Sequence, residues 1–222
     1  MDEQQAFDRS DRLPQRGPRL MVITGLPGTG KTTLSAAVAK RLGASYVRID
    51  AIETAVVVAA EDFGIGELGR GSLTDVGPVG YVVAHQLAAG NLLIGHDVVV
   101  DAVCPVPESR SGWADLATTC GARLIMIETV LSDRAEHRRR VQQRRPDMPR
   151  QQVPTWEDVE AGEWAPWDET RDGPRTVIDT TSAETALASA LKIIVVDEDA
   201  DAVLGHMSGS APDATERRRR GV

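Results

Sequence analysis

Short apolar runs alternate with segments of helical period along most of this 222-residue chain. The apolar runs predict five strands, over 20–24, 45–49, 96–101, 123–128 and 175–179. Apolar and alanine residues at helical spacing predict helices over about 30–42, 51–60, 76–89, 132–145 and 183–196, and a further helix that ends near Gly121. Strands that alternate with helices are typical of a parallel α/β sheet with right-handed crossovers.

The two ends of the chain and two internal stretches lack this pattern. Residues 1–18 are polar, and residues 197–222 run from acidic to Gly/Ser/Pro and then to four arginines, so we expect both ends to be disordered. Residues 61–75 carry four glycines and predict a flexible loop, and residues 146–174 predict irregular structure. The pattern therefore predicts one domain over 19–196, without internal repeats.

The turn after the first strand carries a phosphate-loop motif. The sequence GLPGTGKT fits G-x-x-x-x-G-K-T/S, and it lies between a predicted strand and a predicted helix, as the motif requires. Backbone N–H groups and the helix N-terminus would hold a polyphosphate, Lys31 would reach the β- and γ-phosphates, and Thr32 would ligate Mg²⁺. We assign nucleotide binding, of ATP or another NTP, to Gly25, Leu26, Pro27, Gly28, Thr29, Gly30, Lys31, Thr32 and Thr33.

Two aspartates follow predicted strands, and ligands of parallel sheets bind beyond the carboxyl ends of the strands. Asp101 closes the run Val98–Val100, where a carboxylate can hold Mg²⁺ directly or through water; capping a turn is the alternative. Asp50 follows the second strand, where it could accept a proton from an attacking hydroxyl. The alternative for Asp50 is an N-cap of a helix starting at Ala51, with Glu53 at the capping-box position.

The helix predicted after the fourth strand contains six arginines. Guanidinium groups from Arg138, Arg140 and Arg144 could close over the nucleotide and stabilise charge on the transferred phosphoryl group. A solvated charged helix and a basic nucleic-acid patch are the alternatives. One helix face cannot carry all six side chains, so we expect one or two of them to meet phosphate.

Composition narrows the function class. The net charge of −8 argues against a general nucleic-acid binder. No apolar run is long enough to cross a bilayer, and the N-terminus has no signal-peptide pattern, so we expect a cytoplasmic protein without membrane contact. Cys104 and Cys120 form no ligand-spaced set with the four histidines, which predicts reduced thiols and no zinc site.

In order, the segments GLPGTGKT, RIDAIE, VVVDAV, the arginine helix and VIDTTS resemble the small P-loop kinases. The chain is most similar to chloramphenicol phosphotransferase and its relatives, and more distantly to zeta toxins. The resemblance covers about residues 20–195 and implies five parallel strands in the order 2-3-1-4-5, with a lid over about 132–170. It also implies Asp50 as base, Asp101 at the metal, and Thr180 and Thr181 near adenine.

The chain departs from this family in its 61–75 loop and in the Trp/Pro-rich segment 153–167. These two segments are where such a kinase would select its acceptor, so the resemblance does not imply an antibiotic substrate. Trp156, Trp164 and Trp167 could pack an irregular segment onto the core, or they could form an aromatic wall for acceptor or adenine.

We therefore expect an ATP- and Mg²⁺-dependent kinase, monomeric or homodimeric, that phosphorylates a hydroxyl of a small molecule such as an antibiotic or metabolite. A kinase of nucleotides, sugar-nucleotides or nucleic-acid 5′ ends is the alternative among kinases. A regulatory P-loop ATPase is the alternative of another class. The absence of an Asp-Glu pair after the third strand, which would activate water, argues against the ATPase.

Overall fold

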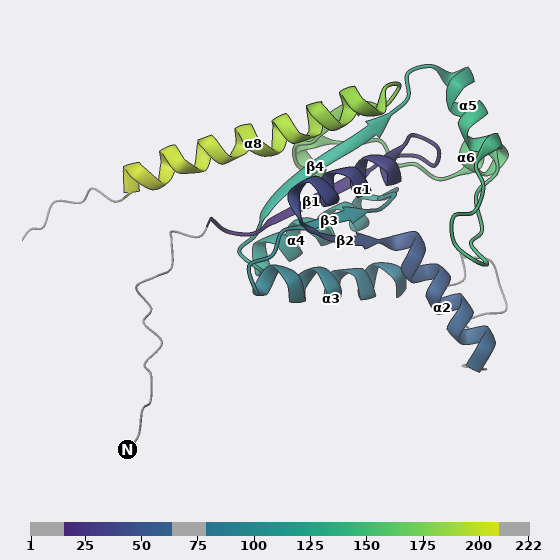
Figure 1. The fold of residues 1–222 in the computed structure, drawn as a ribbon, viewed down its shortest axis with the longest axis horizontal. Helices are drawn as coiled ribbons and strands as arrows, with labels where there is room; N and C mark the ends of the chain where they lie inside the picture. The colour runs from purple at the N-terminus through teal and green to yellow at the C-terminus, as the bar shows by residue number, and fades with distance from the viewer. Residues whose placement is uncertain (1–15, 64–78, 209–222) are drawn as a thin grey trace, which may run out of the picture.

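The computed structural model describes residues 16–63 and 79–208; the predictions for 1–15, 64–78 and 209–222 lie outside these residues. Its centre is a parallel five-stranded sheet in the order β2-β3-β1-β4-β5, which confirms the predicted order (Figure 1). The strands are β1 (Arg19–Thr24), β2 (Ser45–Arg48), β3 (Val98–Asp101), β4 (Arg123–Val130) and β5 (Thr176–Asp179). Strands β1 and β3 are buried at every position, as expected for continuous apolar runs covered on both faces.

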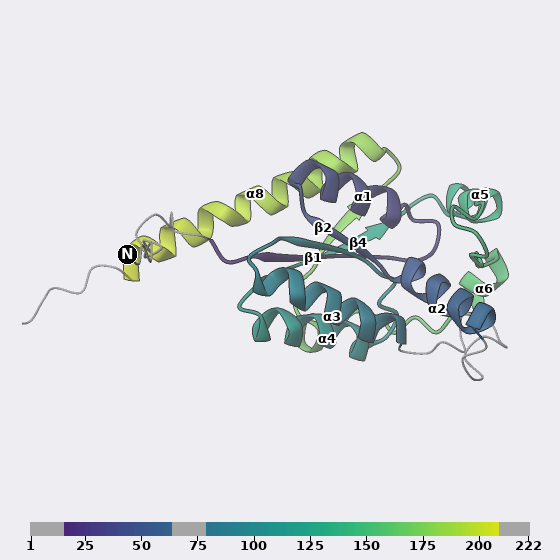
Figure 2. The same cartoon turned by 60° about the horizontal axis from the view of Figure 1, so that its bottom comes forward.

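Helices cover both faces of the sheet. Figure 2 shows α1 (Lys31–Leu42) and α8 (Ala183–Ser208) on one face, and α3 (Val79–Leu93) and α4 (Pro107–Thr119) on the other. Alternate residues of β1 serve the two layers: Met21 and Ile23 pack with α1 and α8, and Leu20 and Val22 pack with α3 and α4.

The remaining helices gather at the carboxyl end of the strands. They are α2 (Ile49–Phe63), α5 (Arg134–Gln143), α6 (Trp156–Ala161) and α7 (Glu169–Asp172). Helix α2 packs on α3, and α5 packs on α6 (Figure 1). The register sets Asp101 of β3 opposite Ile23 of β1, so the end of β3 lies beside the start of the phosphate loop.

Several boundaries differ from the sequence prediction. Helix α8 continues to Ser208, so 197–208 is helical where disorder was expected; no proline or glycine interrupts the sequence between Ala183 and Ala202. Helix α2 begins at Ile49 rather than Ala51. The segment 146–174 contains two short helices, and the first is started by a capping box between Thr155 and Asp158.

Candidate active site

The phosphate loop joins β1 to α1 through glycines in left-handed or otherwise positive-φ backbone. A Cβ on Gly25 would lie 2.3 Å from the Thr129 Oγ1, and one on Gly28 would lie 2.5 Å from the Val141 Cγ2. The Thr129 hydroxyl bonds the Thr29 hydroxyl at 2.8 Å, so the end of β4 braces the loop. Close neighbours on both sides therefore hold the loop in its shape.

Lys31 is the centre of a charged cluster. It is the first residue of α1 and is only 4% exposed. Burial lowers the pKa of its ammonium group, while the carboxylates of Asp101 and Asp50 oppose that shift and the guanidinium groups of Arg144 and Arg48 add to it. The structure thus brings Lys31 together with Asp50 and Asp101, which the sequence placed at one sheet edge, and with Arg144, from the predicted arginine-rich helix.

Asp101 ends β3 and is 2% exposed. Its Oδ2 accepts a hydrogen bond from the Tyr46 hydroxyl at 3.0 Å, and a hydrogen bond from Thr32 also stabilises its charged form. Burial nevertheless raises the pKa of the carboxyl, with Lys31 opposing. Its Oδ1 is buried and has no hydrogen-bond partner among the described residues. An unpartnered carboxylate oxygen beside the Thr32 hydroxyl fits a hard divalent cation.

Asp50 lies in the first turn of α2 and faces three donors. Its Oδ2 accepts from Arg144 at 3.2 Å, from Arg48 at 3.4 Å and from Gln151 at 3.5 Å. The interpretation of Asp50 as an N-cap is wrong, because the helix already begins at Ile49. The side chain is 27% exposed, so a substrate group can approach it.

Arg48 is a site residue that the sequence reasoning missed. Its guanidinium pairs with Asp147 at 2.7 Å and lies 3.7 Å from the Asp101 Oδ2 as well as near Asp50. The sequence did offer one signal for it, because Arg48 lies near the end of a predicted strand and two positions before Asp50. Arg48 links the candidate base Asp50 to the candidate metal ligand Asp101, and its pair with Asp147 ties the segment after α5 to β2.

The arginines in α5 and directly after it differ from one another in their surroundings. Arg140 donates to the carbonyl oxygens of Thr180 and Thr181 at 3.2 and 3.3 Å, and it pairs with Glu136. The Arg138 guanidinium lies 6.0 Å from the Trp156 ring. A cavity of about 420 Å³ beside the phosphate loop is lined by Gly28, Gly30, Lys31, Thr32, Thr33, Arg48, Arg139, Arg140, Gln143, Arg144, Arg145 and Asp147. Arg140 and Arg144 thus line the cavity beside the phosphate loop, whereas Arg138 does not.

The tryptophans divide between the two interpretations. Trp156 is buried in a small apolar cluster with Val141, Val159 and Leu26, which is core packing. Trp164 and Trp167 line a cavity of about 200 Å³ next to Gly25 and Leu26. Trp167 is held between the guanidinium groups of Arg110 and Arg175, each 4.8 Å from its ring centre. A wall for a ligand therefore remains a prediction for Trp164 and Trp167.

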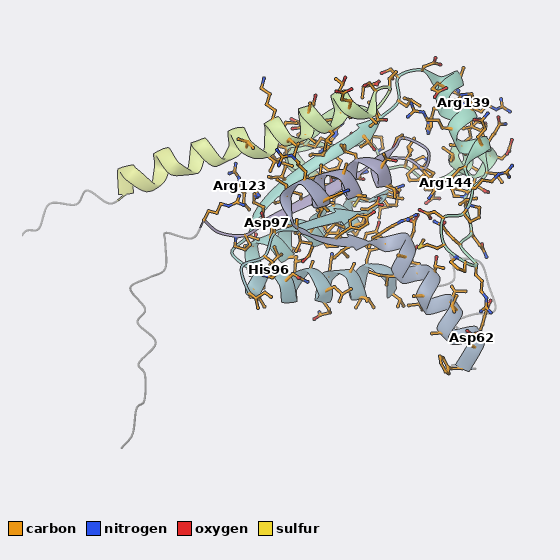
Figure 3. The ribbon with its side chains drawn as sticks, viewed as in Figure 1. Asp62, His96, Asp97, Arg123, Arg139 and Arg144 are labelled. Carbon is orange, nitrogen blue, oxygen red and sulfur yellow. The ribbon has the colours of Figure 1, made fainter. Side chains whose placement is uncertain are left out.

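A larger cavity lies elsewhere. It measures about 650 Å³ and is bordered by Leu42, Gly43, His96 and Asp97, at the amino end of the strands. Figure 3 shows His96, Asp97 and Arg123 at that end, and Arg139 and Arg144 at the opposite end. None of the candidate catalytic residues borders this cavity, so its size does not identify the site.

Glu53 provides a test of the packing between α2 and α3. A Cβ on Gly80 would lie 2.6 Å from the Glu53 Cγ, so this carboxyl is wedged between the helices. Burial, reinforced by the charge of Asp50, raises the pKa of Glu53 from 4.5 to about 7. The folded state therefore binds a proton on Glu53 more tightly than the unfolded state does. The stability that this proton contributes is complete below pH 4.5 and is lost as the pH rises through about 7.

We accordingly expect Glu53→Gln to leave stability unchanged at low pH and to raise it by about 1–3 kcal/mol above neutrality, relative to wild type. Urea denaturation across this pH range measures the difference. Glu61→Gln, at an exposed position of the same helix, is the control. Equal stability of Glu53→Gln and wild type at alkaline pH would contradict the assignment.

Comparisons place the chain among proteins with this fold. A family model described as an AAA domain matches residues 20–160. Comparison with curated protein sequences finds no match. No helix in residues 16–63 and 79–208 has the length and apolar character needed to cross a bilayer.

Solved structures give the fold more directly. A candidate kinase from Chloroflexus aurantiacus is similar at 24% identity, with 83% of this chain and 98% of that chain covered and a TM-score of 0.61. A sugar kinase from Janibacter sp. is similar at 16% identity, with 79% of this chain and 93% of that chain covered and a TM-score of 0.54. A gluconokinase from Sinorhizobium meliloti is similar at 16% identity, with 82% of this chain and 98% of that chain covered and a TM-score of 0.51. The chain has the P-loop kinase fold that the sequence predicted, and its specific likeness to chloramphenicol phosphotransferases stays a prediction.

Proposed function

This chain belongs to the AAA domain family, and we propose that it is a kinase that transfers the γ-phosphate of ATP to a hydroxyl of a small molecule, with Mg²⁺. One observation carries the proposal. Two carboxylates flank the buried Lys31 in different surroundings: Asp101 is enclosed beside Thr32, and Asp50 is partly exposed on α2. A second carboxylate that activates water for ATP hydrolysis would be expected directly after Asp101, where this chain has Ala102, whereas Asp50 lies on α2, where it can meet a hydroxyl acceptor.

The proposed roles follow from where each group lies. The loop amides and Lys31 hold the phosphates, and Arg140 and Arg144 stabilise the charge that develops on the transferred group. Thr180 and Thr181 border the adenine side. Thr32 and Asp101 would hold Mg²⁺, which supplies charge neutralisation on the phosphate oxygens.

Asp50 is the proposed base for the acceptor. A hydroxyl seated beside Asp50 would be oriented by its carboxylate and would give up its proton to it as the oxygen bonds to phosphorus. Arg144, Arg48 and Gln151 contact the Oδ2 of this carboxylate. The acceptor therefore has to use the Oδ1 or displace one of these donors.

Two alternatives stay open to experiment. The acceptor could be a nucleotide, a sugar-nucleotide or a nucleic-acid 5′ end. Two of the similar structures are a sugar kinase and a gluconokinase, so sugars and sugar acids are the first acceptors to test. A regulatory ATPase is the alternative of another class, and one similar structure, Kti12 from Chaetomium thermophilum, was solved with ADP-AlF3. Incubation with ATP, Mg²⁺ and a metabolite and antibiotic panel, scored for a phosphate mass gain, tests the proposal. Fast ATP turnover without any acceptor would favour the ATPase.

The metal assignment makes its own prediction. Asp101→Asn removes one negative charge beside Thr32, so we expect a higher Mg²⁺ concentration for half-maximal transfer, by about tenfold or more. Titration of activity against Mg²⁺ at saturating ATP measures the shift. Asp115→Asn, on the surface of α4, is the control. An unchanged Mg²⁺ requirement in a folded Asp101→Asn protein would remove Asp101 from the metal site.

A further inference from the structure

Resting on the proposed function, we propose that His137 is a positioning residue: it fastens α5 to the phosphate loop and so sets Arg140 and Arg144 in the phosphate cleft. The sequence reasoning did not single out this histidine. Its ring is 7% exposed within a helix that otherwise carries mostly charged and polar residues. A buried imidazole in such a helix has to be explained by what it contacts.

The first contact is a hydrogen bond to the loop itself. The His137 Nε2 lies 2.7 Å from the carbonyl oxygen of Pro27. A carbonyl oxygen only accepts, so the Nε2 carries the hydrogen and donates it. Pro27 has no backbone N–H, so its carbonyl is the polar backbone group that this position of the loop offers to α5.

Apolar packing reinforces the same junction. Val141 lies one turn after His137 on the same side of the helix, against Gly28, where a Cβ would come within 2.5 Å of its Cγ2. Val141 also packs with Leu26, Trp156 and Val159. The His137 ring meets the Trp156 ring edge-on, with centroids 5.3 Å apart and an interplanar angle of 89°.

The position of α5 decides where its arginines lie. Arg140 is three residues after His137 and reaches the carbonyls of Thr180 and Thr181 beyond β5. Arg144 is seven residues after it and reaches Asp50 on α2. The two arginines therefore contact opposite sides, the end of β5 and α2, and the His137 contact anchors the helix three residues before the first of them. A group that acts only on developing charge has to be placed closely, because a misplacement of about 1 Å can cost about 100-fold in rate.

The test compares two substitutions at this one position. In His137→Gln the amide nitrogen can still donate to the Pro27 carbonyl, whereas His137→Leu fills the space without a donor. We expect His137→Leu to lower kcat by about tenfold to 100-fold with less than about threefold change in MgATP affinity, and His137→Gln to recover most of the loss. His137→Met serves as a second donor-free variant should the leucine protein fail to fold.

A double-mutant comparison separates positioning from general damage to the loop. In a background of Arg140→Ala and Arg144→Ala, His137→Leu should lower kcat by no more than about twofold, because the groups that it positions are gone. A loss as large as in the wild-type background would mean that His137 supports the loop and not the arginines, and this would overturn the proposal.

Hydrogen exchange of α5 amides in the nucleotide-free protein gives a readout that needs no substrate. Exchange should be faster in His137→Leu than in wild type and near wild type in His137→Gln. Failure of the wild-type protein to phosphorylate any acceptor would count against the proposed function, and the exchange experiment would still decide the anchoring. Unchanged exchange in a folded His137→Leu protein would overturn the inference while leaving the kinase proposal intact.

Discussion

Lys31→Ala is expected to lower ATP-dependent phosphoryl transfer by at least about 10²–10³-fold, the range found when one preorganised electrostatic contact to a transition state is removed. The ammonium group is buried beside Asp101 and Asp50 at the end of the phosphate loop. In such a water-poor site its charge acts on the phosphates far more strongly than it would in water. Transfer measured at saturating ATP gives the effect.

The protein itself should survive this substitution. Burial lowers the pKa of Lys31, so its charged form carries a desolvation cost that alanine does not. Lys40→Ala, at an exposed position of the same helix, is the matched control and should retain full activity. A folded Lys31→Ala protein with an unchanged catalytic rate would exclude the phosphate loop from the reaction.

Asp50→Asn should depress transfer by about 10²–10⁴-fold while leaving MgATP affinity nearly intact, because general-base assistance is of that order and Asp50 meets the acceptor rather than the nucleotide. A loose transition state needs little early deprotonation, so we expect the lower part of this range. Single-turnover transfer measures the loss, and calorimetry measures the affinity.

The neighbouring charges add a second expectation for this variant. Asn still accepts hydrogen bonds from Arg144 and Arg48 through its amide oxygen, so the arrangement of these arginines should persist. Asp62→Asn, at the far end of α2, is the matched control on the same helix (Figure 3). Near-wild-type transfer by a folded Asp50→Asn protein would contradict the assignment of Asp50 as the base.

The sequence could predict the parts of the site that follow from local pattern and from sheet geometry. The phosphate loop is a contiguous motif, and Asp101 closes a buried strand next to it, so the parallel order of the strands brings the two together. Lys31 and Asp101 were therefore predictable as neighbours from the sequence. Asp50 followed from the same rule for the carboxyl ends of strands.

What the sequence could not predict are contacts between residues far apart in the chain. His137 bonds Pro27, 110 positions away, and Arg48 bonds Asp147, 99 positions away. Neither pair belongs to a motif, and both depend on where α5 and the segment after it fold back. The packing of Trp156 under Val141 depends on the same return of the chain. For the same reason, the sequence left open which of the arginines line the cavity beside the phosphate loop.

The fate of the γ-phosphate tests the central claim most directly. ATP labelled in its γ-phosphate is incubated with Mg²⁺, the protein and the acceptor panel, and the label is followed into organic product and into inorganic phosphate. A kinase built as described should place most of the label in one hydroxyl-bearing compound, and Lys31→Ala and Asp50→Asn should both lose that product. Label that appears only as inorganic phosphate, at a rate that no member of the panel changes, would contradict the account.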